Sequence, residues 1–247
     1  MNAQAGLLTN SISGTTVTYN NVSEDITAAT LATFGAFEPS TGTYGQPSVS
    51  GNQLDFNPTG LVAGGANGDF MIKDAELTFE AKADEGFHIP DLVFSEAGDT
   101  ILNEIVLGSA TPNTRTSVEF TYFIDIIEVD QIPFTGTLSN YSGTASFAFF
   151  QAPGDLGTTN WTGTANIDIE QILIDSGISY TFGATEVGVK IDNILYAYSE
   201  NGTIASIKKK DADGFAVTAV SIPEPASAVL LVGMTSGLMF VRRRLIS

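Results

Sequence analysis

The chain has 247 residues, of which 28 are acidic and 10 are basic, and it contains no cysteine. The net charge of −18 repels phosphate backbones, which excludes nucleic acid as an expected partner. Without cysteine, disulfides, thiolate metal sites and cysteine nucleophiles are excluded as well. Hydrophobic residues make up 43% of the chain, enough to bury a core.

The first five residues contain the small-x-small pattern Ala3-Gln4-Ala5, which is typical of a signal-peptidase cleavage site. No basic and apolar segment precedes this pattern. We therefore expect residues 1–5 to be the remnant of a signal peptide or its cleavage region, with the true start codon upstream of Met1. Signal peptidase and the general secretion machinery are then expected partners.

A short N-terminal helix is expected over residues 26–34. Ser23 is a favourable N-cap, and the carboxylates of Glu24 and Asp25 suit the positive end of a helix dipole. Almost everything after this helix has the short alternating runs of strands, separated by Gly, Asn and Pro. Strands are expected over residues 77–83, 87–94, 118–125, 145–150, 165–169, 187–198, 203–207 and 215–220.

Turn residues set the expected connections. Residues 49–56 predict a hairpin with Gly51-Asn52 at its turn, and Glu200-Asn201-Gly202 predicts a second hairpin. Residues 95–99 are expected to form a loop. The expected fold is therefore an all-β sandwich, jelly-roll-like or a related barrel, with one short N-terminal helix and a C-terminal single transmembrane helix. Residues 6–221 would form one extracellular domain.

The sequence offers little for catalysis. His88 is the only histidine, and no G-x-S-x-G elbow is present, so a nucleophilic triad is not expected. Two carboxylate pairs could each share one sheet face, Glu119 with Asp125 and Asp168 with Glu170. Such pairs arise readily among 28 acids, and we expect no enzyme.

The sequence offers two kinds of candidate binding site, and each also has an interpretation without a ligand. Asp211 with Asp213, and Glu96 with Asp99, each place two acids beside a glycine and could hold Ca²⁺, although neither matches an EF-hand loop. The alternative is solvated turn acids. Trp161 is the candidate glycan contact, with Tyr196 and Tyr198 on one strand face, and its alternative is a core position.

The C-terminus has three parts in a fixed order. Pro223-Glu224-Pro225 forms a stiff stretch, residues 226–241 carry no charge, and the arginine cluster Arg242, Arg243 and Arg244 follows. A helix over residues 226–241 rises about 24 Å, close to the roughly 30 Å of a hydrocarbon core. The arginines orient it with the cluster in the cytoplasm and the rest of the chain outside.

This tail, residues 222–247, resembles the PEP-CTERM sorting domain of Gram-negative bacteria, and the body is similar to uncharacterised proteins of that group. The resemblance implies processing by an exosortase near Pro223-Glu224-Pro225, after transient anchoring in the inner membrane. It also implies release to the cell surface or medium and association with exopolysaccharide or biofilm. We therefore expect a structural or adhesive matrix protein. A carbohydrate-binding module and a carboxylate-based polysaccharide hydrolase are the alternatives.

Overall fold

The computed structural model describes residues 5–25, 44–58, 60–108, 113–136, 141–150, 156–209 and 215–224. Several segments and residues singled out from the sequence lie outside the described residues. They are the helix over residues 26–34, the calcium ligands Asp211 and Asp213, and, in the tail, Pro225, the apolar segment 226–241 and the arginine cluster. Within the described residues, no helix is long and apolar enough to cross a membrane.

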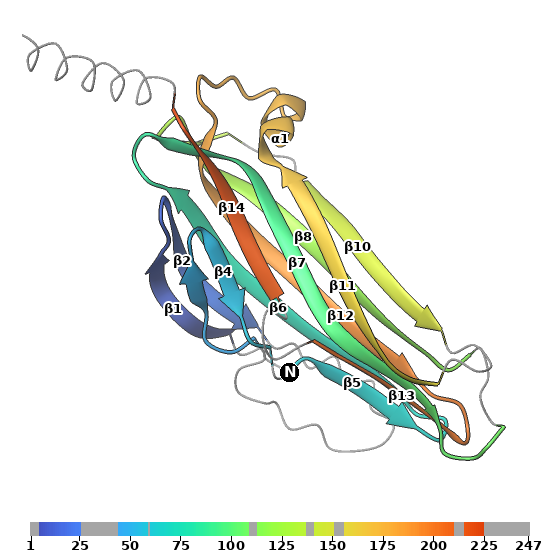
Figure 1. The fold of residues 1–247 in the computed structure, drawn as a ribbon. Coiled ribbons are helices and arrows are strands. Elements are labelled where there is room, and N and C mark those ends of the chain that lie inside the picture. The colour runs from blue at the N-terminus through green and yellow to red at the C-terminus, as the bar shows by residue number, and fades with distance from the viewer. Residues whose placement is uncertain are drawn as a thin grey trace, which may run out of the picture.

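Two antiparallel sheets form the fold (Figure 1). The first, sheet A, has the strand order β1-β2-β6-β12-β8-β10, with the short β9 paired to β8. Its strands are β1 (Ala5–Ser13), β2 (Val17–Asp25), β6 (Phe70–Ala83), β8 (Arg115–Val129), β9 (Ile132–Pro133), β10 (Tyr141–Phe150) and β12 (Ala184–Tyr198).

The second, sheet B, has the order β3-β4-β14-β7-β13-β5, with β11 also paired to β7. Its strands are β3 (Ser48–Ser50), β4 (Gln53–Phe56), β5 (Val62–Ala66), β7 (Phe87–Glu104), β11 (Gly157–Asp168), β13 (Thr203–Lys209) and β14 (Phe215–Pro223). The long β7 bonds β14 along its first half and β13 along its second half.

One hydrophobic core lies between the sheets. Alternate residues of β6, β7, β12 and β13 are buried, as expected where one face of each strand is packed and the other is solvated. The rings of Tyr44, Phe56, Phe94 and Phe215 are fully or almost fully buried and contact one another edge-on or tilted. The prediction of antiparallel β-structure is confirmed for the described residues, including the hairpin at Gly51-Asn52. The central strands are longer than expected, since β7 has 18 residues and β8 and β12 have 15 each.

The loop expected over residues 95–99 is wrong. These residues continue β7, and they pair with β14 and β13 on one side and with β11 on the other. Glycine and acidic residues are typical of loops. Here Gly98 is needed because Trp161 and the Lys208 carbonyl lie where its Cβ would be, and Glu96 points into the core.

The expected second hairpin at Glu200-Asn201-Gly202 is also corrected. A tight turn forms there, with the Thr203 amide donating to the Glu200 carbonyl at 3.0 Å. The strands that it joins do not pair, because β12 lies in sheet A and β13 in sheet B. The turn therefore carries the chain across the core from one sheet to the other.

Ser23, Glu24 and Asp25 do not open a helix as expected, because they belong to β2 and pair with β6. The one helix within the described residues is α1 (Ile169–Asp175), near the end of β11. Asp168 caps it by accepting a hydrogen bond from the Gln171 amide at 2.7 Å. Three buried side chains, Ile169, Ile172 and Leu173, fix it against the core.

Candidate functional site

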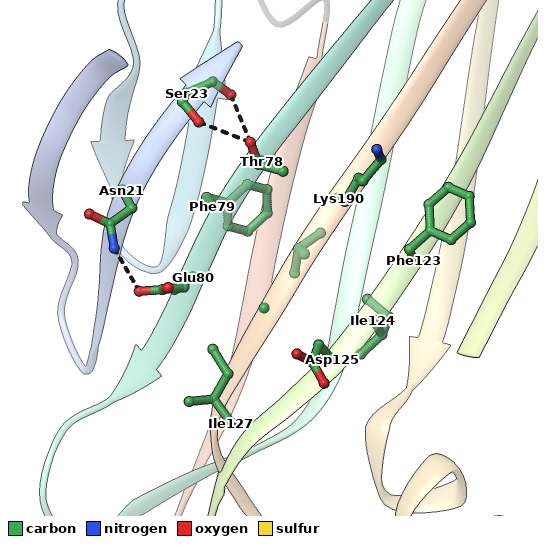
Figure 2. Close-up of a pocket in the computed structure, with 12 residues that line it drawn as sticks. Asn21, Ser23, Thr78, Phe79, Glu80, Phe123, Ile124, Asp125, Ile127 and Lys190 are labelled. Carbon is green, nitrogen blue, oxygen red and sulfur yellow. Dashed lines mark hydrogen bonds between the residues drawn. The ribbon is translucent and has the colours of Figure 1, made fainter. Parts of the chain in front are cut away.

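A groove of about 670 Å³ lies on the outer face of sheet A, where β2, β6, β12 and β8 run side by side (Figure 2). It belongs to the solvated faces of strands whose other faces form the core. Its lining includes polar side chains, one exposed aromatic ring and a glycine. The volume is within the range of roughly 300–1,000 Å³ typical of small-ligand sites.

The floor of the groove is set by Gly188 in β12. Gly188 pairs with Glu80 of β6 on one side and with Asp125 of β8 on the other. Because glycine has no side chain, the space between these two carboxylates stays open. The neighbouring strands are each about 4.8 Å from β12, so the backbones that carry the two acids are roughly 10 Å apart.

Two residues after Gly188 in β12, Lys190 lies between Thr78 of β6 and Phe123 of β8. The Phe123 ring is 37% exposed, and the Lys190 Nζ is 5.9 Å from its centroid. Lys190 also forms an ion pair with Glu76. This end of the groove therefore offers an apolar ring face beside a cation.

Three hydrogen bonds fix the wall that β2 contributes (Figure 2), one of them from the Thr78 hydroxyl to the Ser23 carbonyl at 3.4 Å. The Asn21 amide donates to Glu80 at 2.9 Å, and the Ser23 and Thr78 hydroxyls bond each other at 2.9 Å. Asn21 has a φ of 53° at the irregularity where the β2–β6 register shifts. The bulge lets the side chain of Asn21 reach Glu80 on the neighbouring strand.

A second group of charges follows on the same outer face. The pKa of Asp74 is raised to about 7, first by burial, then by a hydrogen bond to Asp192 and by the charges of Asp192 and Glu76. In the folded protein the Asp74 carboxyl therefore keeps its proton at mildly acidic pH.

The raised pKa of Asp74 predicts a pH dependence of stability. An unfolded Asp has a pKa of about 3.9, so between roughly pH 4 and 7 only the folded state keeps the proton. The unfolding free energy should then fall as the pH rises through this window. Urea unfolding at about pH 5 and about pH 8 measures the difference, which Asp74→Asn should reduce. Glu119→Gln, at an exposed carboxylate of β8, is the control, and equal pH slopes in both variants would contradict the raised pKa of Asp74.

The sequence-based catalytic candidates do not assemble. His88 is buried, and its Nε2 lies 3.6 Å from the Glu170 carboxylate. Glu119 and Asp125 do share the outer face of β8, but six residues of strand separate them by about 20 Å, too far for a glycosidase pair. Asp168 and Glu170 share no sheet face, because Asp168 caps α1 and Glu170 lies in its first turn.

Glu96 and Asp99, the second candidate calcium pair, do not converge. They are three residues apart in β7 and so point to opposite faces of sheet B. Glu96 binds Lys209 in the core, whereas Asp99 lies 3.9 Å from Lys208 outside. Within the part of the chain that the structure describes, no three His, Asp or Glu side chains gather as metal ligands.

Trp161 is a core residue and not an exposed glycan contact. Its side chain lies against Gly98 of the neighbouring β7, and the residue is 4% exposed. The plainer interpretation of this residue therefore holds. Tyr196 and Tyr198 do lie on one strand face, where the Arg115 guanidinium covers both rings at 5.6 and 5.4 Å.

The first residues of the segment predicted to be a sorting tail pair with sheet B. Ile222 and Pro223 belong to β14 and pair with His88 and Phe87. The Glu224 amide donates to the Gly86 carbonyl at 2.8 Å. Sheet pairing therefore extends two residues beyond the boundary expected at residue 221.

The groove residues were not singled out from the sequence. The alternation of residues 118–125 does place Glu119, Phe123 and Asp125 on one face, which is a usable signal. Asn21, Glu80 and Lys190 line the groove only because β2, β6, β12 and β8 are neighbours in sheet A. No local sequence pattern predicts this strand order.

No protein-family model matches the chain, and no curated protein matches it. Among solved structures, TmCBM61 in complex with beta-1,4-galactotriose is 10% identical over 68% of this chain and 70% of that chain, with a TM-score of 0.20. The enzymatically active domain of bacteriophage CBA120 tailspike protein 4 is 9% identical over 68% of this chain, with a TM-score of 0.23. This chain spans 19% of the tailspike chain. Likenesses this weak carry no argument about function.

Proposed function

We propose that this chain is an exported cell-surface or matrix protein that binds a polysaccharide through the groove on the outer face of sheet A. The observation that supports this best is the open strip at Gly188, flanked by two carboxylates and followed by the exposed Phe123 ring. The predictions of a jelly-roll-like form and of a structural or adhesive role belong to the same proposal.

The chemistry of the groove suits a sugar ring. A pyranose has an apolar C–H face that packs on an aromatic ring, and hydroxyls at its rim that both donate and accept hydrogen bonds. Phe123 supplies the ring. Glu80 and Asp125 accept hydrogen bonds, and Lys190 donates them. The groove thus combines an apolar contact with a few converging polar groups, as ligand sites do.

Charge narrows the class of glycan. The groove carries two carboxylates against one ammonium group, and the whole chain has a net charge of −18. Anionic polysaccharides would be repelled by both. A neutral polysaccharide is therefore the proposed ligand.

Phe123→Ala should weaken polysaccharide binding by about fivefold, because a stacking contact is worth roughly 1 kcal/mol. Affinity electrophoresis against a panel of neutral and anionic polysaccharides measures this. Phe70→Ala is the matched control, since Phe70 is also 37% exposed and lies in the same sheet. Binding that survives Phe123→Ala, or that is confined to anionic polymers, would contradict the proposal.

The same samples test the hydrolase alternative. The backbones that carry Glu80 and Asp125 are roughly 10 Å apart, and inverting glycosidases hold their two carboxyl groups about 6.5–9.5 Å apart. We propose binding without catalysis, so incubation of a bound polysaccharide with the protein should release no reducing ends. Release that Asp125→Asn abolishes would favour the hydrolase.

Export and sorting are proposed from the tail sequence. An uncharged stretch followed by Arg242, Arg243 and Arg244 is expected to halt the chain in the inner membrane, and exosortase would then cleave near Pro223-Glu224-Pro225. Replacing the three arginines with glutamine should leave the tail unprocessed, as shown by the size of the protein in membrane and medium fractions. Replacing Lys208, Lys209 and Lys210 together would not be a suitable control, because Lys209 is buried and its loss could unfold the domain. The control for the loss of positive charge is Lys190→Gln. Normal maturation of the arginine variant would overturn the sorting proposal.

A further inference from the structure

A lysine, a glutamate and an asparagine meet in the core between the two sheets. Lys209 comes from β13, Glu96 from β7 and Asn193 from β12. The side chains of Lys209 and Glu96 are 0% exposed, and Asn193 is also 0% exposed. Charged residues are almost never this deeply buried without a specific arrangement, and burying an ion pair seldom stabilises a fold. The cluster therefore needs a reason other than packing.

The three side chains contact one another directly. The Lys209 Nζ lies 2.6 Å from the Glu96 Oε1 and 2.8 Å from the Asn193 Oδ1. The Asn193 Nδ2 donates to the Tyr44 hydroxyl at 2.9 Å, and this hydroxyl donates to the Ala75 carbonyl at 3.2 Å. These bonds fix the carboxamide so that its carbonyl faces the lysine. The carbonyl carbon is one bond away from the oxygen that Nζ already contacts.

The surroundings favour the uncharged form of Lys209. Burial lowers the pKa of the Lys209 ammonium group, against the opposing effect of Glu96. The Nζ also lies 4.9 Å from the centre of the Phe215 ring. The second carboxyl oxygen of Glu96, Oε2, is buried and accepts no hydrogen bond from the described part of the chain. Glu96 is therefore placed to accept the proton that Lys209 gives up, because its carboxylate lies 2.6 Å from Nζ and has a buried oxygen without a hydrogen bond from the described residues.

We propose that Lys209 and Asn193 join through an isopeptide bond, with Glu96 as the general acid and base. Glu96 first takes a proton from the ammonium group. The neutral Nζ then attacks the Asn193 Cγ, and the new carbon–nitrogen bond forms as the carbonyl π electrons move to Oδ1, which the Glu96 acid stabilises by hydrogen bonding. Glu96 moves a proton from Nζ to Nδ2, the bond between Cγ and Nδ2 breaks, and ammonia leaves. No oxidant or cofactor is needed, because an amide replaces an amide.

The product would connect the two sheets covalently. Asn193 lies in sheet A and Lys209 in sheet B, and the chain between them crosses the core at the turn before Thr203. The buried position excludes water, which would otherwise compete with the amine for the carbonyl carbon. In a chain without cysteine, this bond supplies the kind of cross-link that disulfides give other exported proteins.

Mass spectrometry of the purified full chain tests the inference. Cleavage after acidic residues separates residues 193–200 from residues 201–211. We expect the two segments to appear as one branched peptide, lighter by one ammonia than the sum of the separate peptides. Finding only the two free peptides with intact Lys209 and Asn193 would overturn the proposal. This measurement needs no variant, so it is decisive even if every substitution in the core prevents folding.

Variants then assign the roles. Lys209→Met removes the amine but keeps an unbranched apolar stem, and Glu96→Gln removes the proton carrier but keeps the shape; both should give the unlinked mass. Lys208→Met is the control, because Lys208 points outside the sheet toward Asp99, and it should keep the linkage. A linked product in Glu96→Gln at the wild-type rate would show that Glu96 does not take part.

Discussion

Replacing Glu96 with alanine should lower the free energy of unfolding by about 3–5 kcal/mol. The substitution leaves the Lys209 ammonium group in the core without its carboxylate, and the nearest other acceptor is a neutral amide oxygen of Asn193. Removing one partner of a buried pair is costly because the remaining charge is neither hydrated nor compensated. If the isopeptide bond forms in the wild type, the variant loses the cross-link as well.

Urea unfolding measures this loss, with Asp99→Ala as the matched control. Asp99 lies three residues along the same strand, but its side chain points outward and its distance to Lys208 is 3.9 Å. A pair at the surface contributes about 0–1 kcal/mol. Equal losses of unfolding free energy in the two variants would show that the buried Glu96–Lys209 pair contributes no more to stability than a surface pair. Glu96→Leu combined with Lys209→Met should recover the part of the loss that comes from the buried charge, but not the part that comes from the missing cross-link.

Gly98→Ala should destabilise the fold by about 3 kcal/mol and disturb the only tryptophan. A Cβ at this position would lie inside contact distance of both the Lys208 carbonyl oxygen and the Trp161 ring. Neither can retreat easily, because the carbonyl belongs to a paired strand and the ring is buried. The methyl group must therefore force β11 or β13 away from β7.

Thermal unfolding and Trp161 fluorescence read out this change together. We expect a lower melting temperature and a red shift of the emission, because water would reach the ring. Gly188→Ala is the control: its Cβ would be 3.5 Å from the nearest atoms of Asp125 and Ile127, an ordinary contact. A Gly98→Ala variant as stable as Gly188→Ala, with unchanged emission, would contradict the close packing of Trp161.

Local patterns predicted most strands of this fold because alternation reports on a half-buried strand directly. They failed at residues 95–99, where Glu96 and Gly98 are typical of a loop but point into the core. A residue far away in the sequence explains each of them. Lys209 pairs with the buried charge of Glu96, and the Trp161 ring occupies the space where a side chain at position 98 would lie. A local pattern contains neither partner.

Local sequence patterns also could not predict which of the two sheets each strand joins. Asn201-Gly202 does produce a tight turn, but whether the flanking strands pair with each other or cross to opposite sheets is decided by core packing. The same limit applies to the groove. Phe123 and Asp125 could be placed on one face of a strand from the sequence, whereas their apposition to Gly188 and Glu80 follows from strand order.

The way β14 ends has a mechanical consequence for a chain held by its C-terminus. β14 pairs with β7 from Phe215 to Pro223, and the Glu224 amide adds one more bond, to the Gly86 carbonyl. Tension on the tail directed along β14 would load these bonds in shear, so that many must break together and not one at a time. A tethered copy should therefore withstand drag from flowing liquid far better than a domain whose last strand could be peeled from its end.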